Sequence, residues 1–302
     1  MKRVAIFAYW DREGIIEDYV LYYLQKIKLI ADCIIFSADC QIQQNELSKI
    51  DTIVTHIING RHGEYDFGSY KRGFLYAKEN GLLNDADELI FSNDSCFGPF
   101  YDFDNYFNKI DRTKCDFWGM NYNKQFQKHI GSFFLVFSKK VFESESFILF
   151  INGIKKQERK EDVVLAYETT ITQYLYQNGF KYDYYYPYPS SFRIYNTIFK
   201  EIESRKYPFL KKSMLVNQFS FIVNWAVNNM KHQINSEYPF EFIKQYYKRV
   251  NKNANFQTKL INFMKMWISY FVIIPRTKDR FYILNRWYEK ENDSMNNGKN
   301  DD

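Results

Sequence analysis

The sequence predicts an α/β fold in which a mostly parallel sheet is flanked by helices. Short apolar runs alternate with amphipathic helical segments through the first part of the 302 residues, which is the order of βαβ units. Hydrophobic residues make up 46% of the chain and charged residues 25%, so a sizeable core can form and general disorder is excluded. These observations predict a Rossmann-like sheet with right-handed crossovers, followed by a helical extension.

The first βαβ unit fills about the first 40 residues. Apolar runs at 4–9 and 33–37 predict buried strands, and residues 11–14 predict a loop after the first of them. Between the two strands, apolar residues recur at spacings of three and four, which indicates one face of an amphipathic helix. That face consists of Ile16, Tyr19, Val20, Tyr23, Leu24 and Ile27.

The same alternation continues along the chain. Helices are expected at 70–80 and 163–178, because a glycine follows each periodic run, at Gly81 and Gly179 respectively. Further strands are expected within 50–58, at 88–92, at Phe117–Trp118 and at 133–137.

After about Tyr195 the pattern becomes mostly helical. Polar breaks occur at Tyr207-Pro208 and Tyr238-Pro239, and Pro275 ends a last apolar helix expected at 259–274. We therefore divide the chain into an α/β domain (1–195), a helical and basic region (196–290) and a disordered polar tail (291–302).

The net charge of +5 is unevenly distributed. Between Lys200 and Lys290 there are 17 Lys and Arg against 6 Asp and Glu. This imbalance indicates a surface for an anionic partner, such as anionic lipid, a lipid-linked diphosphate or nucleic acid. Nucleic acid is disfavoured, because the basic residues interleave with apolar helix faces and no nucleic-acid motif is present.

The cysteines and the N-terminus indicate a cytoplasmic protein. The four cysteines form no CxxC pair and have no zinc-ligand spacing, so we expect reduced thiols. The first apolar run is too short for a signal peptide. The sequence contains no stretch of about 20 apolar residues, so we expect no membrane-spanning helix.

The best candidate for chemistry is Asn93-Asp94-Ser95, directly after the strand expected at 88–92. Ligands of open α/β sheets bind beyond the carboxyl ends of the strands. An Asp held there can coordinate a divalent metal on a diphosphate, and the metal then neutralises charge as the nucleotide leaves. The alternative is an ordinary turn, since Asn, Asp and Ser all favour turns.

The segment 59–72 resembles a loop that leads into a helix. Backbone amides at the helix start, with Lys71 and Arg72 nearby, could meet a diphosphate. The segment is neither a Walker loop nor a dinucleotide fingerprint. A well-capped surface loop is the alternative.

Glu168 is the candidate general base, because a carboxylate on a helix can take a proton from a sugar hydroxyl. Glu161 and Asp162, just upstream, are the fallback candidates. A solvated glutamate on a helix face is the alternative. Trp118 and His129 are ambiguous between sugar contact and a purely structural role.

Several segments together resemble the rhamnan synthesis protein F family of glycosyltransferases. The resemblance covers roughly residues 3–215, and Asn-Asp-Ser-x-x-Gly-Pro with Asp-Phe-Trp-Gly is its most specific pair of motifs. The matching segments are Ala5–Tyr9 with Asp18–Val20, Tyr65–Lys71, Ser92–Pro99, Asp116–Met120, His129–Phe137, Tyr167–Glu168 before Gly179–Phe180, and Tyr207–Lys212.

The resemblance implies a GT-A-like catalytic domain over 1–195 that transfers rhamnose or a related sugar into cell-wall, capsular or O-antigen polysaccharide. Its partners would be a nucleotide-sugar donor, dTDP-rhamnose by analogy, and a glycan or lipid-linked acceptor. Such folds usually hold Mn or Mg with an Asp-x-Asp element, of which only Asp94 is present here. The implied donor residues are Tyr9, Asp66, Gly68, Lys71, Asn93 and Ser95; the implied acceptor residues are Trp118 and His129; Asp94 and Glu168 would be catalytic.

A second class of function also fits the sequence. A catalytically silent glycan-binding or scaffold subunit of a polysaccharide assembly complex would keep this fold and the region around Trp118, but would bind no nucleotide. Binding of nucleoside diphosphates distinguishes the two classes.

The apolar helix expected at 259–274 suggests a peripheral contact with the inner membrane surface. It is too short and interrupted to span, but it contains Trp267 and other residues that settle at an interface. Basic residues flank it: Lys252, Lys259, Arg276, Lys278 and Arg280. The alternative is a helix that packs its apolar face on the catalytic domain.

Overall fold

The computed structural model describes residues 1–123, 127–187, 202–216, 218–251 and 255–272. Of residues 187 and 265–272 only the backbone is described. The tail predicted at 291–302, together with Ile274 and Pro275 at the predicted helix end, lies outside the described residues.

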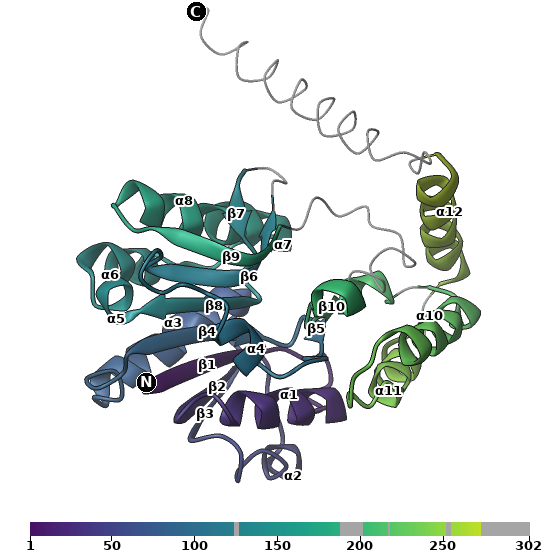
Figure 1. Ribbon diagram of the computed structural model, residues 1–302. Coiled ribbons are helices and arrows are strands. Elements are labelled where there is room, and N and C mark those ends of the chain that lie inside the picture. The colour runs from purple at the N-terminus through teal and green to yellow at the C-terminus, as the bar shows by residue number, and fades with distance from the viewer. Residues whose placement is uncertain (124–126, 188–201, 217, 252–254, 273–302) are drawn as a thin grey trace, which may run out of the picture.

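A central mixed sheet organises the molecule (Figure 1). Its order is β3-β2-β1-β4-β8-β6-β7, and β9 also pairs with β6. β8 lies antiparallel between β4 and β6, and β7 is antiparallel to β6; every other neighbouring pair is parallel. The predicted mostly parallel α/β sheet flanked by helices is confirmed. The strands are β1 (Arg3–Tyr9), β2 (Cys33–Ala38), β3 (His56–Asn59), β4 (Glu88–Asn93), β6 (Phe117–Asn123), β7 (His129–Ile130), β8 (Phe134–Ser138) and β9 (Tyr182–Pro187).

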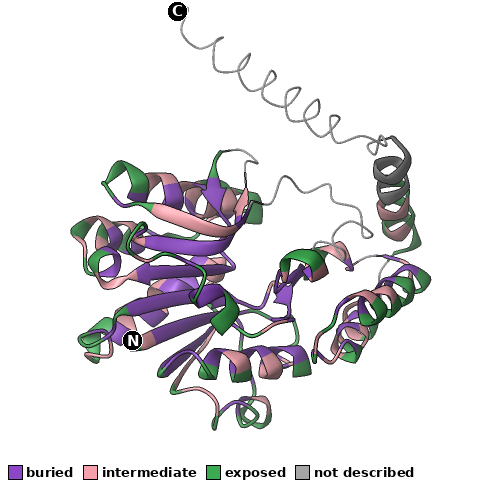
Figure 2. Cartoon of the chain, viewed as in Figure 1, coloured by how far each residue is buried: buried purple, intermediate pink, exposed green. Residues whose placement is uncertain are grey.

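Both faces of this sheet are covered, so the inner strands β1, β2, β4 and β8 are almost entirely buried, whereas β3 and most of β9 are partly exposed (Figure 2). Alternate residues of β1 enter two different cores: Phe7 packs toward α1 (Asp18–Lys28), and Ile6 packs toward α3 (Tyr65–Glu79). Side chains of a strand point alternately to opposite faces. Because both faces of β1 are buried, its sequence is a continuous apolar run. Further helices of this part of the chain are α2 (Gln44–Leu47), α4 (Asp104–Phe107), α5 (Lys139–Phe142) and α6 (Glu145–Asn152).

Helix α3 begins at Tyr65, five residues before the predicted start, so the expected loop at 59–72 is shorter than predicted. The start is stabilised from another element: the carboxylate of Asp39, after β2, accepts hydrogen bonds from the backbone N–H groups of His62, Gly63 and Tyr65 at 2.7, 2.6 and 3.0 Å. Local periodicity could not reveal this boundary, because the capping group lies far away in sequence.

The helix predicted at 163–178 consists of three segments: α7 (Lys160–Val163), a π-helical turn η1 (Val164–Glu168) and α8 (Thr169–Gln177). A π turn inside an α-helix is uncommon and often occurs at a functional site. Glu168 is the last residue of this turn.

The C-terminal region crosses to the carboxyl edge of the sheet (Figure 1). The short strand β10 (Leu210–Lys211) pairs with β5 (Cys96–Phe97), and η2 (Lys212–Met214) follows it. The helices α10 (Ser220–Gln233), α11 (Glu241–Val250) and α12 (Phe256–Val272) complete the described chain. No helix in the described part of the chain combines the length and apolar character that crossing a bilayer requires.

Candidate functional site

Acidic side chains follow three neighbouring parallel strands at one edge of the sheet. Asp11 comes after β1, Asp39 after β2 and Asp94 after β4, and all three are buried. The carboxyl ends of parallel strands meet at the same edge, which is where open α/β sheets bind their ligands. This edge is therefore the candidate active site.

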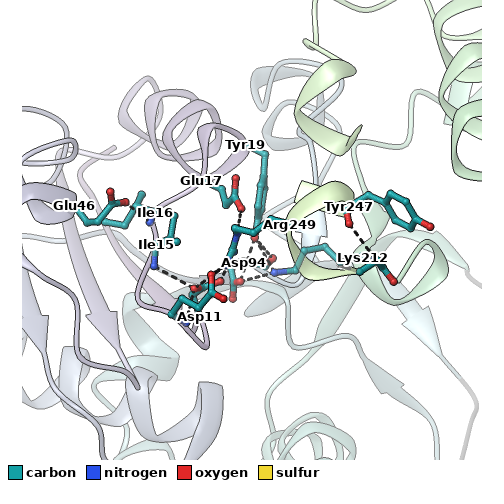
Figure 3. Close-up of polar contacts among 12 residues, drawn as sticks. Asp11, Ile15, Ile16, Glu17, Tyr19, Glu46, Asp94, Lys212, Tyr247 and Arg249 are labelled. Atoms are coloured by element: carbon teal, nitrogen blue, oxygen red, sulfur yellow. Dashed lines mark hydrogen bonds and ion pairs between the residues drawn. The ribbon is translucent and has the colours of Figure 1, made fainter. Parts of the chain in front are cut away.

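Asp94 pairs with a lysine from the C-terminal region (Figure 3). Its Oδ2 lies 2.5 Å from Nζ of Lys212, and the same Nζ donates to the hydroxyl of Tyr19 at 2.7 Å. The rings of Tyr19 and Tyr246 flank the ammonium, with centroids 5.2 and 4.9 Å away. Burial disfavours the charged lysine, but the charge and hydrogen bond of Asp94, together with Tyr246, raise the pKa of Lys212 overall, so the lysine stays protonated.

Asn93 connects Asp94 to the start of α3. Its amide nitrogen donates to Oδ2 of Asp66 at 2.9 Å, and its amide oxygen accepts from the backbone and hydroxyl of Ser95 at 3.1 and 2.5 Å. The bonds between Asn93 and Ser95 fix the Asn-Asp-Ser segment as a turn, and the bond to Asp66 ties this turn to α3. The Asn-Asp-Ser segment is therefore a turn, and this turn also lies at the candidate site.

Asp66 has the most altered carboxyl group at this edge. Desolvation, followed by the negative charges of Asp94 and Glu168, raises its pKa to about 7, although Lys160 and Lys212 act in the opposite direction. A carboxyl with a pKa near neutrality can change its charge under working conditions. The structure therefore places Asp66, Asn93, Asp94, Ser95 and Glu168 in one electrostatically connected group.

Glu168 approaches this group from the π turn η1. Its charge acts on Asp66, Tyr70 and His129, and its own carboxylate has no hydrogen bond or ion pair within the described residues. His129 is buried, with Nδ1 2.7 Å from the backbone oxygen of Gln127. Burial lowers the pKa of His129, so the imidazole is neutral at pH 7.

The fallback bases differ from Glu168. Asp162 is paired with Arg159 at 2.8 Å, and Glu161 is exposed. Glu168 is among the charges that most alter the pKa of Asp66, and neither Glu161 nor Asp162 is among them. Glu168 is thus the one of these three carboxylates that the fold directs to the site.

Two predicted donor residues have other contacts. Lys71 donates to the backbone oxygens of Asn152 and Ile154 at 3.1 and 2.8 Å, at the end of α6. A Cβ added at Gly68 would lie 2.3 Å from Cβ of Glu64 and 2.8 Å from the His62 ring, so this glycine allows close packing within the protein. The structure does not bring these two residues to the carboxylate group.

Tyr9 and Trp118 are buried. The hydroxyl of Tyr9 hydrogen-bonds to the backbone oxygen of Ile15 and its ring packs on Phe36, so it supports the loop after β1. Trp118 is 2% exposed and packs edge-on against Phe107 within the core. A side chain this deep cannot stack on a sugar without rearrangement of the core, so the structure favours the core alternative for Trp118.

Sequence reasoning assigned no role to Lys212 or Arg249, which both reach the site from the C-terminal region (Figure 3). Arg249 on α11 binds Oδ2 of Asp11 at 2.5 Å and also contacts the carboxylates of Glu13 and Glu17. The signal for Lys212 was its position in the family-like segment Tyr207–Lys212. No comparable signal marked Arg249, because its partners lie more than 200 residues away.

The expected divalent metal does not fit the side chains at this edge. Within the residues that the structure describes, no group of three His, Cys, Asp or Glu is arranged to hold a metal ion. The carboxylate of Asp94 is bound to Lys212, and Asn93 and Ser95 contribute neutral groups that bond to each other. Mn and Mg are held by several oxygen ligands, of which carboxylates contribute most of the charge.

Comparison with known proteins identifies one family. The family model described as rhamnan synthesis protein F matches residues 34–278 of this chain, from β2 through α12. The match therefore includes the strand-end residues Asp39 and Asp94 and the C-terminal residues that contact the site, but it begins after Asp11.

Individual relatives are more distant. Protein y4gN of Sinorhizobium fredii is 22% identical over 181 residues, which cover 59% of this chain and 46% of that protein. The virulence protein VirA of Vibrio anguillarum is 29% identical over 125 residues, which cover 41% and 40%. The chain thus spans less than half the length of these relatives. Among solved structures, a nucleoside-diphosphate-sugar pyrophosphorylase of Vibrio cholerae overlaps with a TM-score of 0.40 at 11% identity, covering 62% of this chain and 92% of that one.

Proposed function

We propose that this chain, which belongs to the rhamnan synthesis protein F family, is a glycosyltransferase that extends a bacterial cell-surface polysaccharide. The donor would be a nucleotide sugar, with dTDP-rhamnose as the first candidate, and the acceptor a growing glycan or a lipid-linked saccharide. The observation that supports this most is the gathering of the carboxyl groups of Asp66, Asp94 and Glu168 at the carboxyl edge of the sheet, where Asn93 binds Asp66 next to Asp94. We further propose the division into a GT-A-like catalytic domain (1–195) and a helical basic region (196–290).

In this proposal, the Asn-Asp-Ser turn receives the donor diphosphate. Asn93 and Ser95 hold the turn in its conformation. The ammonium of Lys212, which is paired with Asp94, faces the negatively charged diphosphate. Asp66, bound to Asn93, lies beside the sugar. His129 is as buried as Trp118, so we propose that it supports the site next to Glu168 rather than contacting the acceptor.

Glu168 would be the general base of an inverting transfer. The acceptor hydroxyl gives its proton to the Glu168 carboxylate while its oxygen bonds to the anomeric carbon. The bond from that carbon to the diphosphate oxygen breaks, and its electron pair leaves with the nucleoside diphosphate. A carboxylate without a hydrogen-bond partner in the described chain, next to the site, is suited to this step.

The test is Glu168→Gln, with Glu161→Gln on the exposed face of the same helix as the matched control. Nucleotide sugars are screened for transfer, beginning with dTDP-rhamnose. Glu168→Gln should keep donor affinity and lose transfer by about 100-fold or more, the usual scale for loss of a general base. The control should retain wild-type turnover.

A parallel loss of donor affinity and transfer would make Glu168 a binding residue instead. If no nucleoside diphosphate raises the melting temperature, the alternative of a catalytically silent glycan-binding or scaffold subunit is favoured.

We also propose that the protein works in the cytoplasm, in peripheral contact with the inner membrane surface. Apolar side chains on α10 and α12 are exposed: Phe221, Trp225, Phe256, Leu260, Ile261 and Met264. The surrounding C-terminal region has the excess of basic residues noted above, which suits an anionic bilayer. Access to a lipid-linked acceptor would follow from this contact.

Vesicle flotation tests the membrane contact. The wild type should float with anionic vesicles, less so at high salt, because salt screens the charge attraction. Ile261→Glu, at a side chain that is 52% exposed, should reduce flotation without unfolding. Leu149→Glu on the distant helix α6, at 58% exposure, is the matched control and should float normally. Flotation that is absent at low salt would favour a helix that packs on protein.

A further inference from the structure

The cationic group next to Asp94 is the ammonium of Lys212. Lys212 is only 13% exposed, and its two hydrogen bonds go to Asp94 and Tyr19. An ammonium has three N–H donors, so one of them has no hydrogen-bond partner within the described residues. The ammonium lies between two tyrosine rings, which hold it in one position, unlike the ammonium of a lysine on an open surface.

A neighbouring lysine adds a second positive charge. Lys211 is exposed, its ammonium lies 5.5 Å from the centroid of the Phe133 ring, and it makes no ion pair within the described part of the chain. The backbone sets the position of both lysines: Lys211 is paired with Cys96 in the β5–β10 ladder, and the N–H of Lys212 donates to the oxygen of Ser95 at 3.0 Å. Two lysines thus extend from backbone positions that are fixed beside the Asn-Asp-Ser turn.

We propose that Lys212, assisted by Lys211, takes the place of the divalent metal and neutralises the donor diphosphate, so that donor binding needs no metal ion. This inference rests on the proposed function and specifies its donor site. The unused N–H of Lys212 donates to a diphosphate oxygen. When the bond from the anomeric carbon to the diphosphate breaks, the lysine stays protonated and stabilises the charge that develops on the leaving group.

Asp94 then has a different role from the metal ligand predicted from the sequence. Its carboxylate orients the Lys212 ammonium and keeps it charged inside a partly desolvated site. Asp94 is thus a positioning residue for the lysine. The neutral Asn93 and Ser95 are consistent with this arrangement, because a lysine needs one carboxylate partner and a divalent cation prefers several.

Calorimetric binding of dTDP, UDP and GDP to the full chain tests the inference, with either EDTA or Mn present. At least one nucleotide should bind with a Kd that differs by less than twofold between the two conditions. Lys212→Met should weaken that binding at least tenfold, and Lys212→Arg should restore part of it. Lys78→Met, an exposed lysine on α3, is the matched control and should bind normally.

Removal of Lys212 alone leaves the Asp94 carboxylate buried and unpaired, so Lys212→Met could fail to fold. The double variant Asp94→Asn with Lys212→Met removes both charges, and it should fold but bind at least tenfold more weakly. Metal-dependent binding by the wild type, or wild-type affinity in either Lys212→Met variant, would overturn the inference and leave the glycosyltransferase proposal intact. Absence of binding for every nucleotide, with and without Mn, would overturn both.

Discussion

Replacement of Asp66 by Asn should stabilise the protein at neutral and alkaline pH. Asp66 is the carboxyl whose pKa rises from its ordinary 3.8 to about 7, chiefly through desolvation and then through the charge of Asp94. Asparagine has nearly the same shape and can still accept the hydrogen bond from Asn93. The substitution therefore removes the charge with little change in packing.

The sign follows from proton binding in the two states. Between about pH 4 and 7 the folded protein keeps the Asp66 proton and the unfolded chain has lost it, so stability falls as pH rises through this window. A shift from 3.8 to about 7 corresponds to about 4 kcal/mol as an upper limit. Because Asp66 retains some solvent contact, we expect about 1–3 kcal/mol of penalty above pH 7.

The assay is urea unfolding of wild type and Asp66→Asn at pH 4.5, 6 and 8. The two free energies of unfolding should nearly agree at pH 4.5, and the variant should be more stable by about 1–3 kcal/mol at pH 8. Asp51→Asn, at an exposed turn, is the control and should show no such trend. A variant that is less stable at pH 8, or a difference that does not change with pH, would refute the reasoning.

Two further substitutions examine residues whose positions only the structure shows. Arg249→Met should cost about 2–4 kcal/mol in chemical unfolding, because it leaves the buried carboxylate of Asp11 and the partly buried carboxylate of Glu17 without their ion pairs. Arg159→Met, at a surface ion pair, should have little effect, and equal losses would contradict the anchoring role. Trp118→Ala should lower the free energy of unfolding by about 3–5 kcal/mol, because it leaves a cavity in the core. Trp118→Phe should keep most of the stability and leave the acceptor KM unchanged. A raised acceptor KM in a stable Phe variant would show that Trp118 contacts the acceptor.

Local sequence determined the elements of the α/β half. The strands at 4–9, 33–37 and 88–92 and the helix after the first of them were predicted to within one or two residues, because a buried parallel strand and an amphipathic helix are each defined by a short periodic pattern. Asp94 was also predictable as a site candidate, since it lies directly beyond a strand end. The short strands β5 and β10 were not predicted, because two residues give no period.

The tertiary structure decided which residues meet at the site. Lys212 reaches Asp94 across 118 positions and Arg249 reaches Asp11 across 238, and no local pattern encodes either contact. Packing likewise buried Trp118 and directed Lys71 to the end of α6, although their residue types suit ligand contact equally well. Sequence specifies what each side chain can do chemically, but charge pairing and burial depend on distances through space, and these are fixed only when the C-terminal region closes over the strand ends.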